Sequence, residues 1–172
     1  NGIVTINAGT MMGGGNVNGS LTVNGGTLAV GFSPGTLNIA GSLVLGGAST
    51  TAIELGGTGG GQFDLINVGG NAALDGALVV TYWGGFSGGG TFPVMSWGSS
   101  SGSFASTSFP VAGFTLTYGA AGLTLDLPTG ALPGVVGPVS DVLAALQTNQ
   151  LIVLLDGLDP EDSLLAEETA EG

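Results

Sequence analysis

Carboxylates are the main side chains of this sequence with which acid–base chemistry could be done. The 172 residues include 12 Asp and Glu but no Lys, Arg, His or Cys. Glu54, Asp64 and Asp75 are the acids of the central region, and a pair of carboxylates flanking a sugar bond is the machinery of glycosidases. Such a site would have to work without a basic partner. We therefore interpret the three acids as solvated charges on outward strand positions, and we predict no catalytic residue and no enzyme activity.

A second group of acids lies in the C-terminal tail. Asp156, Asp159, Glu161 and Asp162 are close together in the sequence, and oxygen ligands of this kind suit a hard cation such as Ca²⁺. Their spacing does not match the EF-hand loop, and acidic tails are usually solvated. We therefore predict that the chain holds no metal and no cofactor.

The charge balance excludes several classes of partner. The formal net charge is −12 at pH 7, and a chain without cations cannot neutralise phosphates, so we expect no nucleic-acid binding. Anionic membrane surfaces are disfavoured for the same reason. The longest aliphatic run, residues 151–155, is too short to span a bilayer, so we expect no membrane span. Because no salt bridge between side chains can form, apolar packing and backbone hydrogen bonds must stabilise the fold.

The elements that carry these residues are short segments in which apolar residues alternate with small or polar ones. Such a period of two is typical of strands with one buried face. The motif that begins at Gly19 (GSL) recurs at Gly41, 22 residues later. A repeat of about that length with three short strands fits one coil of a solenoid. The alternating apolar pairs are Leu21 and Val23, Leu28 and Val30, Leu37 and Ile39, Leu43 and Leu45, and Ile53 and Leu55.

A different all-β architecture remains open at this point. The sequence VNGGTL, residues 23–28, contains Asn24-Gly25, which is a strong local hairpin signal. An antiparallel β-sandwich or jelly roll is therefore the alternative. The 22-residue recurrence favours the solenoid, whereas the short Asn-Gly turn favours the sandwich.

Residues 81–127 contain most of the aromatic side chains, including both Trp residues, Trp83 and Trp97. An aromatic cluster can be a platform for carbohydrate, or it can be a bulky plug that closes the end of a β core. Most of the large side chains here alternate with polar neighbours, so we favour the plug. The carbohydrate alternative predicts that Trp83 and Trp97 are both exposed.

The C-terminal region has a different composition. Residues 128–139 (PTGALPGVVGPV) hold three prolines and three glycines, and this composition predicts a linker. Ser140-Asp141 could begin a helix, which would run through residues 142–155 or end near Thr148 and be followed by a strand at 150–155. The predicted organisation is a β-solenoid domain at 1–127, a linker at 128–139 and an extension at 140–172.

The repeats resemble those of large secreted bacterial β-helix proteins, especially autotransporter passengers and related surface adhesins. The segments that carry the resemblance are GTLNIAGSLVLGG at 35–47, AIELGG at 52–57 and FDLINVGGNAALDGALVV at 63–80. The resemblance covers residues 19–127, and the hydrophobic segment after residue 139 is not part of the pattern. It implies a right-handed parallel β-helix that is exported to the cell surface or beyond, where it would act in adhesion, in a biofilm matrix or in filaments.

From these features we expect an extracellular structural protein that assembles with copies of itself. A detached apolar segment, residues 131–155, would cap or enter the next subunit, and such head-to-tail contacts build open filaments. The alternative is an adhesin or a carbohydrate-binding module of a larger secreted protein, with surface glycans as partners.

Overall fold

The computed structural model describes residues 2–31 and 33–128, and every structural statement below refers to these residues. Contacts divide the chain into two units, Asn1–Thr129 and Gly130–Gly172. The predicted linker from residue 129 onward, the predicted C-terminal helix or strand, the segment 131–155 and the acids from Asp156 onward therefore lie outside the described residues.

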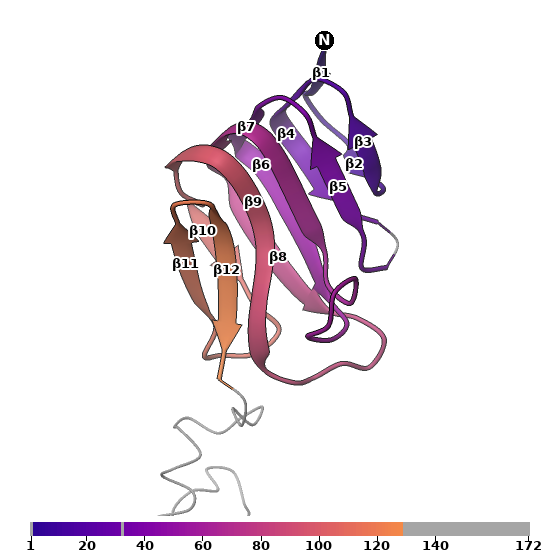
Figure 1. The fold of residues 1–172 in the computed structure, drawn as a ribbon, viewed down its shortest axis with the longest axis vertical. Helices are drawn as coiled ribbons and strands as arrows, with labels where there is room; N and C mark the ends of the chain where they lie inside the picture. The colour runs from indigo at the N-terminus through magenta and orange to yellow at the C-terminus, as the bar shows by residue number, and fades with distance from the viewer. Residues whose placement is uncertain (1, 32, 129–172) are drawn as a thin grey trace, which may run out of the picture. The chain divides into compact units, whose positions relative to one another are not determined.

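The described chain is all-β, as expected, and its twelve strands belong to one mixed sheet (Figure 1). The strands are β1 (Ile3–Ile6), β2 (Thr10–Met12), β3 (Gly15–Val17), β4 (Ser20–Ala29), β5 (Thr36–Ile39), β6 (Leu43–Leu55), β7 (Leu65–Leu74), β8 (Ala77–Tyr82), β9 (Gly90–Gly102), β10 (Ser106–Ser108), β11 (Thr115–Gly119) and β12 (Gly122–Leu127).

The strands pair in three ladders. Ladder A contains β1, β4, β6, β7 and β9, and ladder B contains β2, β4, β6, β8 and β10. Ladder C contains β3, β5, β7, β9, β12 and β11. Every pair is parallel except the last two of ladder C, in which β12 is antiparallel to both β9 and β11. Long strands serve two ladders, because β4, β6, β7 and β9 each bend from one ladder into another.

The register confirms the repeat that the sequence predicted. Leu21 lies beside Leu43 in the parallel pair of β4 and β6, which is the 22-residue step between the two GSL motifs. The step is shorter before this point, from Ile3 to Ser20, and longer after it, from Leu43 to Ala72. The alternating apolar residues of the sequence, Leu21 to Leu55, are all buried. Aliphatic side chains therefore stack on equivalent positions of neighbouring strands, which removes them from water.

The hairpin on which the sandwich alternative depended, at Asn24-Gly25, does not form. β4 continues through these residues without reversing and pairs in parallel with β2 on one side and β6 on the other. Gly26 adopts a φ of 84°, and a Cβ there would overlap the carbonyl oxygen of Gly9. These glycines therefore make a corner within the strand, at which the chain passes from ladder A to ladder B, and they do not reverse its direction.

The predicted aromatic plug is largely confirmed. Phe92 is fully buried and its ring lies edge-on to Phe63, with centroids 5.8 Å apart, and near Phe86 at 6.1 Å. Trp97 is also buried. Aromatic rings thus fill the core where the sheet changes from parallel to antiparallel pairing.

A row of amide side chains follows ladder C on its outward face. The Asn38 Nδ2 donates a hydrogen bond to Asn16 Oδ1 at 3.0 Å, and Asn67 Nδ2 donates to Asn38 Oδ1 at 2.9 Å. The row ends at Ser96, whose hydroxyl donates to Asn67 Oδ1 at 2.7 Å. Asn38 and Asn67 each both donate and accept along the stack, so the row reinforces the backbone ladder without any charge.

The amide row predicts unequal effects at its middle and its end. Asn38→Ala removes two of these hydrogen bonds, and we expect it to lower the free energy of unfolding by about 1–2 kcal/mol. Asn16→Ala removes only one, at the exposed end of the row, and serves as the matched control with a smaller loss. Urea unfolding of both variants measures the difference. An Asn38→Ala variant as stable as the wild type would show that the row does not stabilise the stack.

Candidate functional site

The structure places the three central acids in different environments. Asp75 is exposed, as predicted, and its Oδ1 accepts a hydrogen bond from the Gly76 N–H at 2.7 Å. Glu54 lies on β6 with a half-buried side chain. The prediction that Asp64 points outward is wrong, because its residue is only 1% exposed.

The buried carboxylate of Asp64 accepts hydrogen bonds from two backbone amides. The Gly35 N–H donates to Oδ1 and the Glu54 N–H donates to Oδ2, each at 2.8 Å. Gly35 precedes β5 and Glu54 lies near the end of β6, so one side chain joins two segments that are distant in sequence. The carboxylate thereby satisfies two N–H groups at the place where the chain leaves the regular ladders for the Gly-rich loop 56–62.

Burial raises the pKa of Asp64 from 3.8 to about 6. The hydrogen bonds from the two backbone amides oppose this rise, and the nearby charge of Glu54 adds to it. Burial also raises the pKa of Glu54, whose Oε2 is buried without a hydrogen-bond partner in the described part of the chain.

Raised carboxylate pKa values are common among catalytic acids, but the geometry of this pair indicates a different role. Both oxygens of Asp64 are occupied by backbone amides, and the side chain does not reach a surface at which a substrate could bind. Asp64 therefore has a structural role, because its carboxylate holds two backbone segments together. Within the described ranges, no three acidic or other metal-ligating side chains come together.

The two Trp residues also lie in different environments. Trp97 is buried in the core, whereas Trp83 is 42% exposed. The Trp83 ring lies beside Gly56 and close to Pro34, at the base of the Gly-rich loop. The structure therefore offers one exposed indole where the carbohydrate alternative predicted two.

The most distinctive surface is the end of the molecule formed by β1, β2 and β3, which we call the N-edge. Each of these strands pairs with a neighbour on one side only within the described chain, β1 and β2 with β4 and β3 with β5. Their outer N–H and C=O groups are available to a further strand. The N-edge therefore has the form of a template for strand addition.

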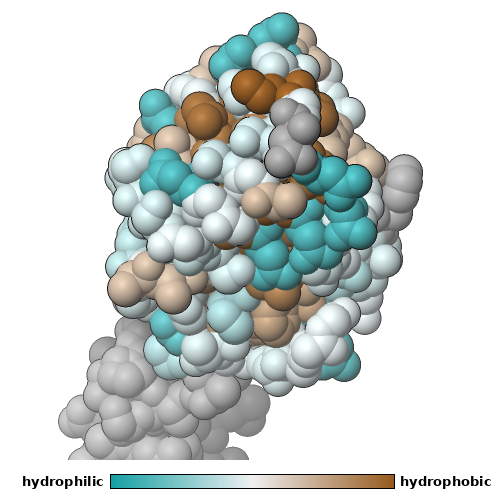
Figure 2. Space-filling view, turned by 45° about the horizontal axis from the view of Figure 1, so that its top comes forward, coloured by the Kyte–Doolittle hydropathy of each residue, from teal (hydrophilic) through white to brown (hydrophobic). Residues whose placement is uncertain are grey.

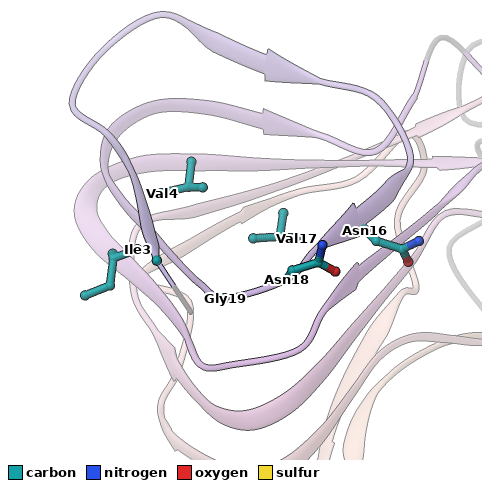
Figure 3. A pocket seen from close by; sticks show the side chains of 7 residues that line it. Ile3, Val4, Asn16, Val17, Asn18 and Gly19 are labelled. Atoms are coloured by element: carbon teal, nitrogen blue, oxygen red, sulfur yellow. The ribbon is translucent and has the colours of Figure 1, made fainter.

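The N-edge is also hydrophobic. Ile3 is 70% exposed, Met12 47% and Val4 44%. Figure 2 brings this end of the molecule forward and shows hydrophobic atoms in its surface, next to a hydrophilic band. An open hollow of about 430 Å³ lies here between β1 and β3. Figure 3 shows Val4 and Val17 pointing toward the interior and Ile3 and Asn16 pointing away.

No charge protects the N-edge. The first charged residue of the chain is Glu54, so residues 1–53 contain none, and the first proline is Pro34. Natural sheet edges are usually blunted by charged side chains, proline or bulges that prevent pairing with another sheet. An edge without these devices is suited to association. The alternating apolar pairs of the sequence begin at Leu21, so they contained no signal that β1, β2 and β3 lie at an end of the stack.

Comparison with known proteins finds no family model and no curated protein that matches this chain. No helix among the described residues is long and apolar enough to cross a membrane.

The buried carboxylate predicts a pH dependence of stability. The pKa of Asp64 is about 6 in the folded protein, above its ordinary 3.8, so the folded state binds this proton more tightly than the unfolded chain does. Stability from this group therefore increases as the pH falls from above 6 toward 4, by on the order of 2 kcal/mol. We expect Asp64→Asn to lose most of that increase in urea unfolding between pH 7 and pH 4.

Asp75→Asn is the matched control, because it removes the same charge from an exposed position. The Asp75→Asn variant should retain most of the increase in the free energy of unfolding between pH 7 and pH 4. An Asp64→Asn variant whose stability rises on acidification as much as that of the wild type would contradict the assignment of Asp64 as the buried titrating group.

Proposed function

We propose that this chain is an extracellular structural protein whose copies assemble end to end into a surface fibre or matrix filament. The observation that carries the proposal is the stack of parallel ladders, in which backbone hydrogen bonds and rows of buried aliphatic side chains join strand to strand. The same pairing can be continued by strands of another copy, which is a general way in which β proteins join one another. The head-to-tail joint through residues 131–155 remains part of this proposal and lies outside the described residues.

We infer further that the three ladders are the faces of a right-handed parallel β-helix. The chain visits ladders A, B and C in turn, with register steps of 17 residues between Ile3 and Ser20 and 22 between Leu21 and Leu43. Parallel strands of one sheet are joined by right-handed connections in nearly all proteins. A stack of this kind is a rod that grows by about 4.8 Å per strand, and this geometry suits a fibre subunit.

Extracellular location is supported by the resemblance of residues 19–127 to secreted β-helix repeats and by the composition. The chain has no Cys that would need a reducing environment, and no Lys or Arg at which trypsin-like proteases cut.

Electron microscopy of the purified full chain tests the proposal. We expect filaments whose number rises with protein concentration. Assembly should also increase with ionic strength, because each copy carries a net charge of −12 and salt screens the repulsion between copies. Monomers alone at all concentrations and salts would contradict the proposed function.

A second candidate function, adhesion to surface glycans, is favoured by the exposed indole of Trp83. Sugar rings can stack on aromatic faces, and covering roughly 40 Å² of apolar surface in such a contact contributes about 1 kcal/mol. Under this hypothesis Trp83→Ala weakens binding on a glycan array several-fold, whereas Met12→Ala, which removes another exposed hydrophobic side chain, leaves it unchanged. Absence of any glycan binding by the wild type would eliminate this candidate.

A further inference from the structure

We propose that Asp64 is a pH-sensitive switch at the base of the Gly-rich loop 56–62, because its ionised carboxylate holds two backbone amides and its neutral form can hold only one of them firmly. The switch is separate from the proposed function, because it acts within a single chain and does not require assembly. Acidification would loosen this place in the fold while the overall stability of the protein increases.

Four hydrogen bonds join the segment that leads into β7 to the residues on either side of it. The Leu65 N–H donates to the Gly35 carbonyl oxygen at 2.9 Å, and the Asp64 N–H donates to the Glu54 carbonyl oxygen at 3.0 Å. The Asp64 carboxylate adds one bond to each of these neighbours, since Oδ1 accepts from the Gly35 N–H and Oδ2 accepts from the Glu54 N–H. The N–H and the carbonyl oxygen of both neighbours are thus bonded to this one segment.

Protonation changes what the Asp64 carboxyl group can accept. An ionised carboxylate accepts hydrogen bonds at both oxygens, whereas a neutral carboxyl group carries a proton on one oxygen and needs an acceptor for it. Both oxygens of Asp64 face N–H donors, and the residue is only 1% exposed. The oxygen that takes the proton therefore loses its charge-assisted hydrogen bond, and the amide that faces this oxygen loses most of its acceptor.

Few titratable groups face Asp64 from the elements packed against it. Glu54 on β6 is the charged group, and its charge adds to the rise of the Asp64 pKa to about 6. Tyr82 ends β8, which pairs with β6, and burial raises its pKa, so Tyr82 stays neutral throughout the acidic range. Strands β5, β7 and β9 and the loop 56–62 contain no titratable side chain. The two other acids of the described chain lie elsewhere, Asp75 after the far end of β7 and Asp126 on β12.

The release of one amide leaves the rest of the fold intact. The two backbone hydrogen bonds of the segment do not depend on the carboxylate, and the base of the loop is also closed by a bond from the Gly56 N–H to the Gln62 carbonyl oxygen at 2.7 Å. Overall stability still increases below pH 6, because the unfolded chain binds this proton only near the ordinary Asp pKa of 3.8. Local protection and overall stability therefore change in opposite directions.

Hydrogen exchange of the full chain, read at single amides between pH 8 and pH 4, tests the switch. We expect the protection of either the Gly35 or the Glu54 amide to fall about tenfold relative to an unstructured chain at the same pH, as for the loss of one hydrogen bond to a charged group. The midpoint should lie near pH 6. The Leu21 amide, which donates to the Ser42 carbonyl oxygen, is the internal reference and should keep or gain protection.

Two results in the wild type would overturn the inference. Unchanged protection of both amides throughout the range would show that the neutral carboxyl group still holds them. A parallel loss of protection at Leu21 would show that the whole stack opens on acidification, and not one junction within it.

Asp64→Asn imitates the neutral form, because its amide group offers one acceptor oxygen and places an N–H donor on the other side. We expect one of the two backbone amides to be poorly protected in this variant already at pH 8, with no further change on acidification. Asp75→Asn is the matched control and should keep the wild-type profile. Protection of both amides as in the wild type would contradict the switch.

Glu54→Gln tests the neighbouring charge and remains informative if Asp64→Asn does not fold. Because the charge of Glu54 adds to the raised pKa of Asp64, its removal should move the midpoint to lower pH and keep the transition. A transition that disappears in Glu54→Gln would assign the titration to Glu54 and overturn the inference.

Discussion

Hydrogen bonds between parallel backbones are the interaction on which this molecule depends, because its side chains provide no ion pairs. With 12 acids and no cation, the fold must obtain its stability from strand pairing and from the burial of aliphatic and aromatic side chains. Polar side chains then work as extensions of the backbone ladder. Asn38 and Asn67 continue it on the outer face, and Asp64 supplies acceptors where the ladder is interrupted.

The same dependence explains why the two ends of the stack differ so much. Every interior strand has a neighbour on both sides, so only the first and last strands face the problem of unpaired backbone groups. At one end the pairing becomes antiparallel, with β12 between β9 and β11, and aromatic rings pack around Phe92, although β10 and β11 still pair on one side only among the described residues. At the N-edge the described residues contain no equivalent device, and the hydrophobic interior reaches the surface.

Much of this arrangement could be predicted from the sequence, because inward positions must be apolar and therefore leave a visible period of two. The strands from Leu21 to Leu55 and the 22-residue step were predicted in this way and confirmed. The longer step from Leu43 to Ala72 was not predicted, because the additional residues include a loop that repeats no motif. The corner at Gly26 left the sandwich open as an alternative, since a glycine-rich dipeptide signals a bend without specifying whether the chain reverses.

Asp64 illustrates how far the candidate site could be predicted from the sequence. It sits between the apolar residues Phe63 and Leu65, so we expected it to point outward, but the buried residues of β7 are Ile66 and Val68, whose alternation includes position 64. Just before β7, the Asp64 side chain therefore turns inward and accepts hydrogen bonds from two amides of other segments. Those amides are 10 and 29 residues away, and no local pattern could identify them. The N-edge was equally hidden, because the position of a strand within a stack is a property of the whole fold.

The register steps have a consequence for how such a chain can change over time. Successive passages through the ladders differ in length, yet equivalent positions still align, because the extra residues are accommodated between strands. A duplicated passage would find the same inward apolar row and the same outward amides on both of its neighbours. The number of stacked strands is therefore a quantity that gene duplication can adjust while each added strand keeps neighbours of the same kind.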